Sequence, residues 1–139
     1  MRSSRLLAVG LTAAALLATG APAAGQGEEP TLEDTQWSLV GYVDGDTMTD
    51  VPMGIDASLL LQDGTASGSS GCNSFSGSYQ LDGDVLTFEE AFTTTLRACS
   101  GDAEAVETGY YAALPQVSWW ELEGSSLELL DEDFETVLT

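Results

Sequence analysis

The stretch that decides the fold reads GCNSFSGSY and spans residues 71–79. Gly71 and Gly77 flank a predicted tight corner, where a positive φ or the close approach of another segment favours glycine. Asn73 lies in that corner, where its side chain can hydrogen-bond its own backbone. We therefore expect the chain to turn sharply here and then to enter a strand.

That strand is predicted over residues 75–81. Phe75 and Tyr79 are separated by an even number of positions, so their side chains lie on the same face of the strand. We expect this face to pack into the core. The alternative is that the two rings contribute to a binding surface.

Short alternating runs continue on both sides of this strand and are typical of antiparallel sheets. They predict further strands at residues 35–43, 55–62, 85–88, 117–122, 127–130 and 134–138. Residues 47–53 are expected to form a loop, because Pro52 has no N–H for a sheet ladder. Residues 65–70 are small and polar, and no strand is assigned to them.

One helix is predicted over residues 102–114, where apolar side chains recur with helical spacing. Its start has Ser100 or Asp102 as a candidate cap, and Pro115 follows its end. The expected fold class is therefore α+β: a single domain with a curved antiparallel sheet or partial barrel of about seven or eight short strands and one helix.

The N-terminus has the three parts of a secretion signal. Arg2 and Arg5 precede an apolar run at residues 6–17, and Ala-Pro-Ala at residues 21–23 is a small-x-small cleavage pattern. We expect residues 1–23 to be a cleaved signal peptide, 24–31 a flexible leader and 32–139 the folded domain. The run is short for a membrane span, so the alternative of a retained anchor helix is disfavoured and no span is expected after processing.

The charge of the chain is extreme and of one sign. All 23 acidic residues follow position 27, and Arg97 is the only basic residue after the signal, so the processed domain would carry a net charge of −22. This favours a salty extracellular medium, where charges are screened over about 3 Å at 1 M salt; the alternative is an ordinary acidic secreted protein kept in solution by charge. Nucleic-acid partners and anionic membranes are excluded for lack of a basic patch.

Cys72 and Cys99 are the only cysteines. An even count in a small exported domain predicts a disulfide between them, and the alternative is a pair of buried free thiols. The chain has no His and no Lys, which excludes histidine-based triads and lysine nucleophiles. A pair of carboxylates in a cleft is the remaining catalytic option, and we expect no enzyme.

The acidic turns at residues 82–84 and 131–133 offer oxygen ligands for calcium, but neither has the EF-hand spacing. We expect the carboxylates of both turns to be solvated. No metal site and no cofactor are therefore predicted.

Several motifs occur together and in order along the chain. Residues 71–79 resemble the GCN-x-F/Y-x-G-x-Y core of the META domain, the family that includes the heat-shock protein HslJ. The remaining matches are Trp37-Ser38-Leu39, Val85-Leu86-Thr87-Phe88, the T-x-x-A-C pattern of Thr95, Ala98 and Cys99, the helix pattern of Glu107, Tyr110 and Leu114, and Leu127-Glu128-Leu129. The resemblance covers essentially the whole chain after the signal.

This resemblance implies a curved antiparallel sheet with a packed helix, an envelope or secreted location, a link to stress responses and no catalytic residues. Arg97 stands where the family often has Met, and we expect it to pair with a carboxylate, with ligand contact as the alternative. Trp119 and Trp120 are adjacent in a predicted strand, so they point to opposite faces and are candidate ligand contacts.

Three functions remain open from the sequence. The first is a monomeric binding module whose partner is an envelope or extracellular protein or a small ligand. The second is a purely structural module without a specific ligand. The third is a carboxylate hydrolase, which requires two acids roughly 5–10 Å apart in a cleft.

Overall fold

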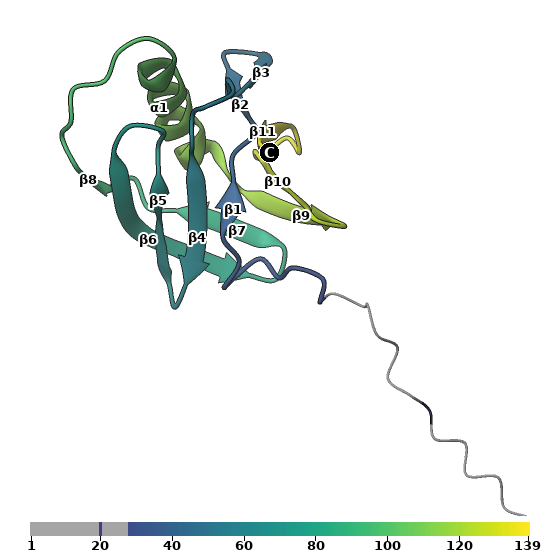
Figure 1. Ribbon diagram of the computed structural model, residues 1–139. Helices are drawn as coiled ribbons and strands as arrows, with labels where there is room; N and C mark the ends of the chain where they lie inside the picture. Colours follow the sequence, from purple (N-terminus) through teal and green to yellow (C-terminus); the bar gives the residue numbers. More distant parts are fainter. Residues whose placement is uncertain (1–19, 21–27) are drawn as a thin grey trace, which may run out of the picture.

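The computed structural model describes residue 20 and residues 28–139 (Figure 1). The predicted signal peptide apart from Gly20, its cleavage site and the first part of the leader lie outside the described residues. Within the described part of the chain, no helix is long and apolar enough to cross a membrane.

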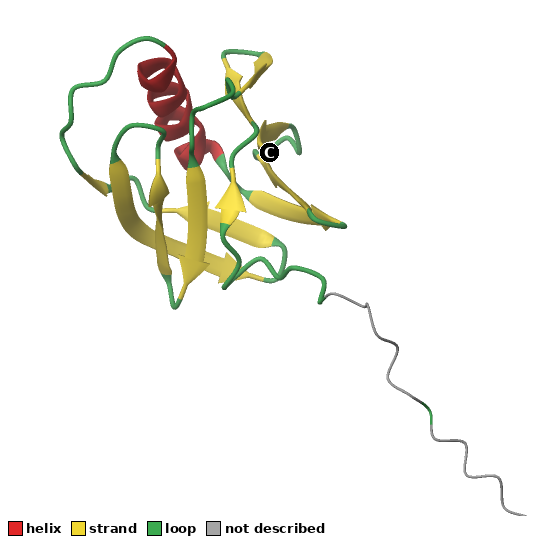
Figure 2. Cartoon of the chain, in the orientation of Figure 1, coloured by secondary structure: helices red, strands yellow, loops and turns green. Residues whose placement is uncertain are grey.

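The described residues form one curved antiparallel sheet and one α-helix (Figure 2). The strands are β1 (Trp37–Ser38), β2 (Gly41–Asp44), β3 (Thr47–Asp50), β4 (Ser58–Gln62), β5 (Thr65–Ser69), β6 (Ser74–Asp82), β7 (Val85–Phe88), β8 (Thr93–Thr94), β9 (Trp119–Glu123), β10 (Ser126–Leu130) and β11 (Thr136–Leu138). Their order is β1-β4-β5-β6-β7-β9-β10-β11-β2-β3, with β8 pairing β6. The sheet curls without closing, because β1 and β3 at its two ends do not pair with each other.

For the described residues, the predicted antiparallel sheet with one helix is confirmed, but the predicted count of seven or eight strands was too low, since these residues form 11 strands. Strand β5 was not predicted because its residues are small. Gly68 in this strand has to be small, because a Cβ there would collide with the carbonyl oxygen of Ser58 in the neighbouring strand. The expected loop at 47–53 begins instead with β3, and Pro52 lies just beyond that strand, where its missing N–H is not needed.

The single strand predicted at residues 35–43 is divided in two. β1 pairs with β4, whereas β2 pairs with β3 and β11 on the other wall of the curled sheet. Residues 39–40 carry the chain from one wall to the other. A hydrophobic pattern alone does not reveal such a crossing, because both short strands alternate in the same way.

Helix α1 (Asp102–Ala113) packs its predicted apolar face against the sheet and continues into the 3₁₀ turn η1 (Leu114–Gln116). Gly109 is the point of closest approach, because a Cβ there would collide with the ring of Tyr42 in β2. The predicted caps were wrong: Gly101 holds the N-cap position, with no side-chain hydrogen bond. The helix thereby covers one end of the curled sheet and the core inside it.

Candidate binding sites

The GCN motif forms a cross-linked corner, and the predicted disulfide between Cys72 and Cys99 is present in it. The two Cα atoms lie 6.1 Å apart and are separated by 27 positions in the sequence. The bridge ties the turn before β6 to the segment that leads into α1. Gly71 has φ = 97° in this turn, so the predicted need for glycine there is confirmed.

Asn73 is the centre of this corner and is buried. Its side-chain oxygen accepts hydrogen bonds from the main-chain N–H of Arg97 at 2.7 Å and from the hydroxyl of Thr95 at 2.9 Å. Its side-chain nitrogen donates to the carboxylate of Glu107 at 2.8 Å. Asn73 therefore joins three segments of the chain through its side chain, which bonds residues 95–99 and Glu107 rather than its own backbone, the bond that the sequence suggested.

Glu107 is held in the corner by more than Asn73. The hydroxyl of Ser70 lies 2.7 Å from the same carboxylate oxygen, and the sulfur of Cys99 lies 3.4 Å from the other. Ligand atoms of Cys72, Cys99 and Glu107 lie within 4.8 Å of one another. Because both sulfurs are in a disulfide, neither is the thiolate that a metal ion would require, and the cluster is a structural one.

The other motif residues line the core or the surface beside this corner. Phe75 makes edge-to-face contacts with three further rings, those of Phe92, Tyr110 and Tyr111. Gly77 lies beneath Phe92 and leaves no space for a Cβ. The sequence prediction of core packing is confirmed for Phe75, as it is for Tyr79.

Tyr79 is buried on the same face, and its hydroxyl donates a hydrogen bond to the carboxylate of Glu33. Burial, together with that bond, raises the pKa of Tyr79 to about 12. Thr95, Arg97 and Ala98 are exposed. The bonds of Arg97 to Asn73 are made by its main chain, and a partner for its guanidinium stays a prediction.

The two adjacent tryptophans lie on opposite faces of β9, as predicted. Trp120 packs against the core, and its indole N–H donates to the carbonyl oxygen of Gly83 at 2.9 Å. Trp119 stacks on Phe134, with ring centroids 4.9 Å apart and an interplanar angle of 22°. Both tryptophans nevertheless line one wide hollow beside β9.

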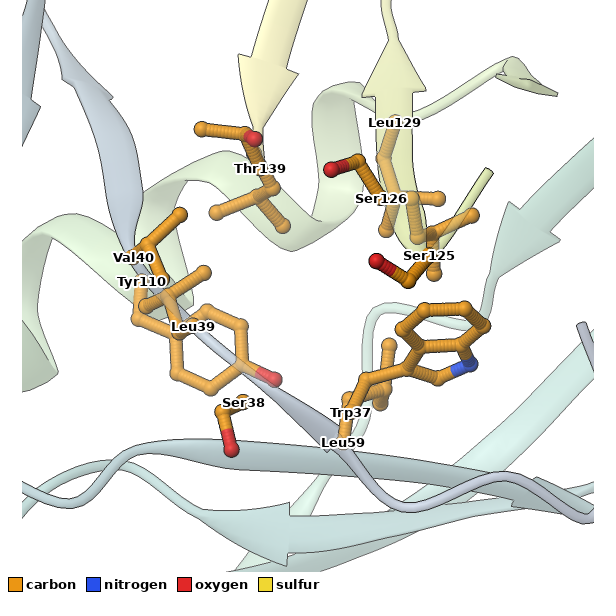
Figure 3. A pocket seen from close by; sticks show the side chains of 12 residues that line it. Trp37, Ser38, Leu39, Val40, Leu59, Tyr110, Ser125, Ser126, Leu129 and Thr139 are labelled. Atoms are coloured by element: carbon orange, nitrogen blue, oxygen red, sulfur yellow. The ribbon is translucent and has the colours of Figure 1, made fainter. Parts of the chain in front are cut away.

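A cavity of about 120 Å³ lies inside the curled sheet, between β1 and β4 on one side and β10 and β11 on the other (Figure 3). We call it the Trp37 cavity, and its walls are Trp37, Ser38, Leu39, Val40, Leu59, Tyr110, Ser125, Ser126, Leu127, Leu129, Leu138 and Thr139. None of these side chains is charged. In a chain with 23 acidic residues, this cavity is a distinct apolar environment.

Two polar groups of the cavity wall are already hydrogen-bonded within the protein. The hydroxyl of Tyr110 donates to the carbonyl oxygen of Ser58 at 3.0 Å, and the indole N–H of Trp37 donates to that of Leu32 at 3.0 Å. Burial raises the pKa of Tyr110, which keeps the phenol neutral. Sequence reasoning missed this cavity: Trp37 and Tyr110 were noted as motif residues, but only the curl of the sheet brings them together.

The curled open sheet, the single helix and the cross-linked GCN corner define the class of protein. The META domain family matches residues 30–139, and the chain belongs to this family. The NMR structure of a protein from Burkholderia xenovorans is similar to it, with a TM-score of 0.63 and 29% identity over 77% of this chain and 81% of that one. No curated protein matches this chain.

Proposed function

We propose that this chain is an exported META-domain binding module, associated with the envelope or the extracellular medium and its stresses, and without catalytic activity. Its ligand is a small, uncharged, largely apolar molecule, bound in the Trp37 cavity. The observation that carries the proposal is the lining of that cavity, whose side chains are all uncharged although the chain is strongly acidic.

The size and walls of the cavity set the class of ligand. An apolar cavity of about 150 Å³ is known to bind benzene, so about 120 Å³ suits a compact molecule of similar size. The binding free energy would become more favourable by about 25 cal/mol for each Å² of apolar Leu and Trp surface that the ligand covers. The hydroxyls of Ser125 and Ser126 face the central space (Figure 3), so a single hydroxyl on the ligand would find a partner.

Export and salt adaptation are supported by separate features. The N-terminal pattern and the disulfide both suit an oxidising compartment, and a processed charge of −22 suits a medium that screens it. The salt proposal predicts that the Tm rises markedly between low salt and about 1–2 M NaCl, because repulsion between carboxylates weakens. A flat Tm profile across this range would contradict it.

Titration with benzyl alcohol, followed by the indole N–H resonance of Trp37, tests the cavity. We expect a saturable shift in the wild-type chain and its loss in Ser126→Leu, which fills the cavity from its exposed rim. Ser78→Leu, the same change at an exposed position of β6, is the matched control and should bind normally. Absence of a saturable shift, or an equal shift in both variants, would favour the purely structural module.

A further inference from the structure

The outer face of β9 and β10 combines exposed rings with opposed carboxylates. We call it the aromatic–acidic face, and it consists of Asp84, Trp119, Glu121, Glu123, Glu128 and Phe134, which surround a wide, open hollow. Trp120 and Leu122 alternate with these β9 residues and pack against the core, and both also line the hollow. The face therefore lies on the side of the sheet away from the Trp37 cavity.

Two glutamates face each other directly on this surface. Glu121 in β9 is the register partner of Glu128 in β10, so their Cβ atoms lie about 4.5–5.5 Å apart. Like charges in this position destabilise a sheet. The only basic residue in the described part of the chain is Arg97, and Figure 1 shows its segment, between β8 and α1, far from β9 and β10.

Phe134 is presented to solvent in an unfavourable backbone conformation. Its side chain is 61% exposed and its φ is 63°, in the left-handed region that a phenylalanine rarely adopts. The side-chain oxygen of Asp131 fixes this turn by accepting the N–H groups of Asp133 and Glu135, each at 2.9 Å. The ring then stacks on Trp119, and we call this stacked pair the aromatic shelf, since it lines the same hollow as the glutamates.

The indole nitrogen of Trp119 adds a third unfavourable feature. It is buried and has no hydrogen-bond partner among the described residues, whereas the indoles of Trp37 and Trp120 both donate to carbonyl oxygens. A buried donor without an acceptor is costly. Opposed charges, a left-handed phenylalanine and an unpaired donor thus occur on one face.

We propose that the aromatic–acidic face is the docking surface for a basic segment of another protein. An arginine side chain would lie on the Trp119–Phe134 shelf by cation–π contact and direct its N–H groups to the carboxylates of Glu121 and Glu128. The cation removes the repulsion between these two glutamates. The site is independent of the Trp37 cavity, and either can fail without the other.

The composition of the face favours a peptide over a metal ion or a single small cation. A calcium ion would bind the carboxylate oxygens, but it would make no favourable contact with the stacked rings. The acidic positions continue along β9 to Glu123 and onto the neighbouring turn at Asp84, so the face has room for more than one basic side chain. At high salt, where long-range attraction is screened, the aromatic shelf would retain the contact.

Isothermal titration of the whole domain with a short arginine–glycine–serine peptide tests the proposal, with the citrulline analogue as the uncharged control peptide. We expect Glu121→Gln/Glu128→Gln to weaken binding by about tenfold or more and yet to raise the Tm by about 2–5 °C, because the repulsion is relieved. Glu89→Gln/Glu104→Gln removes two charges at exposed positions elsewhere and should leave the affinity nearly unchanged.

Phe134→Ala removes the ring and keeps the left-handed backbone. We expect it to weaken binding at about 0.1 M salt and to abolish it at about 1 M salt, where the shelf carries most of the contact. Equal losses in the two glutamate pairs would overturn the proposal in favour of unspecific attraction to an acidic surface. Equal binding of the citrulline peptide, or a response of Trp119 to calcium and not to the peptide, would also overturn it.

Discussion

The GCN corner and the aromatic–acidic face differ in how their carboxylates are paired. In the corner, the carboxylate of Glu107 is bound by Ser70 and Asn73, and the Asn73 side chain uses both its oxygen and its nitrogen. On the face, Glu121 opposes Glu128 and the Trp119 indole has no acceptor. Buried polar groups that are fully paired rigidify a fold, whereas unpaired ones cost stability.

This difference separates the residues that hold the fold from those that are free for a partner. Most of the sequence motif, including Cys72 and Asn73, lies in or beside the corner, which explains why the motif defines a fold more firmly than a function. The face contributes little to that motif. Variants of the corner should therefore lower stability, and variants of the face should change binding.

The largest effect is expected from the disulfide. Replacing Cys72 and Cys99 by Ala should lower the free energy of unfolding by about 3.5 kcal/mol, because a loop of 27 residues is no longer closed in the unfolded chain. Urea unfolding of the variant against the wild-type chain measures it. A loss below about 1 kcal/mol would mean that the corner depends on its hydrogen bonds and not on the bridge.

The next effect comes from Asn73. We expect Asn73→Ala to cost about 2–3 kcal/mol, because it leaves the Arg97 N–H without its acceptor and removes one of the two hydrogen bonds to the same oxygen of Glu107. Ser74→Ala, at the next and exposed position, is the control and should stay within about 0.5 kcal/mol of wild type. Equal stability of the two variants would remove the distinction between corner and face.

Tyr79, in the strand next to the corner, makes the free energy of unfolding depend on pH. Its pKa is about 12 in the folded chain and 10.0 ordinarily, so its contribution is complete below pH 10. Between pH 10 and 12 the unfolded chain loses the proton first, and the free energy of unfolding falls by roughly 2 kcal/mol. Alkaline unfolding should be less steep in Tyr79→Phe, and an unchanged slope would contradict the assignment.

The smallest effect has the opposite sign and lies on the face. Glu121→Gln alone should raise the free energy of unfolding by about 0.2–1 kcal/mol, because it ends the repulsion with Glu128. Urea unfolding at low salt measures the gain, which should shrink as salt is added. If the variant is less stable than wild type, the face is a stabilising part of the fold.

The sequence predicted the corner better than either binding site. Paired cysteines, an even spacing of Phe75 and Tyr79, and a helical repeat are local signals, and the disulfide, the buried face and the helix all followed from them. The small residues of β5 gave no such signal. Their role is to allow the close approach of Gly68 to Ser58 in the neighbouring strand, which the local sequence does not show. Ser100 and Asp102 are residue types that often cap helices, but Gly101 holds the N-cap position.

The two candidate sites depend on features that no local pattern contains. The Trp37 cavity exists only because the curled sheet brings β1 opposite β10. Phe134 reads as an ordinary strand residue in the sequence, yet it lies in a left-handed turn outside any strand. Opposition of Glu121 and Glu128 follows only from the register of β9 and β10.

The three tryptophans allow one measurement to test the central claim. Trp37 lines the cavity, whereas Trp119 and Trp120 line the hollow of the aromatic–acidic face, so a ¹⁵N spectrum of the indole N–H groups reports on the two regions separately. On addition of the arginine peptide, the account predicts that the Trp119 resonance shifts and saturates while that of Trp37 stays in place. A spectrum in which Trp119 does not move, or in which Trp37 moves with it, would contradict the account.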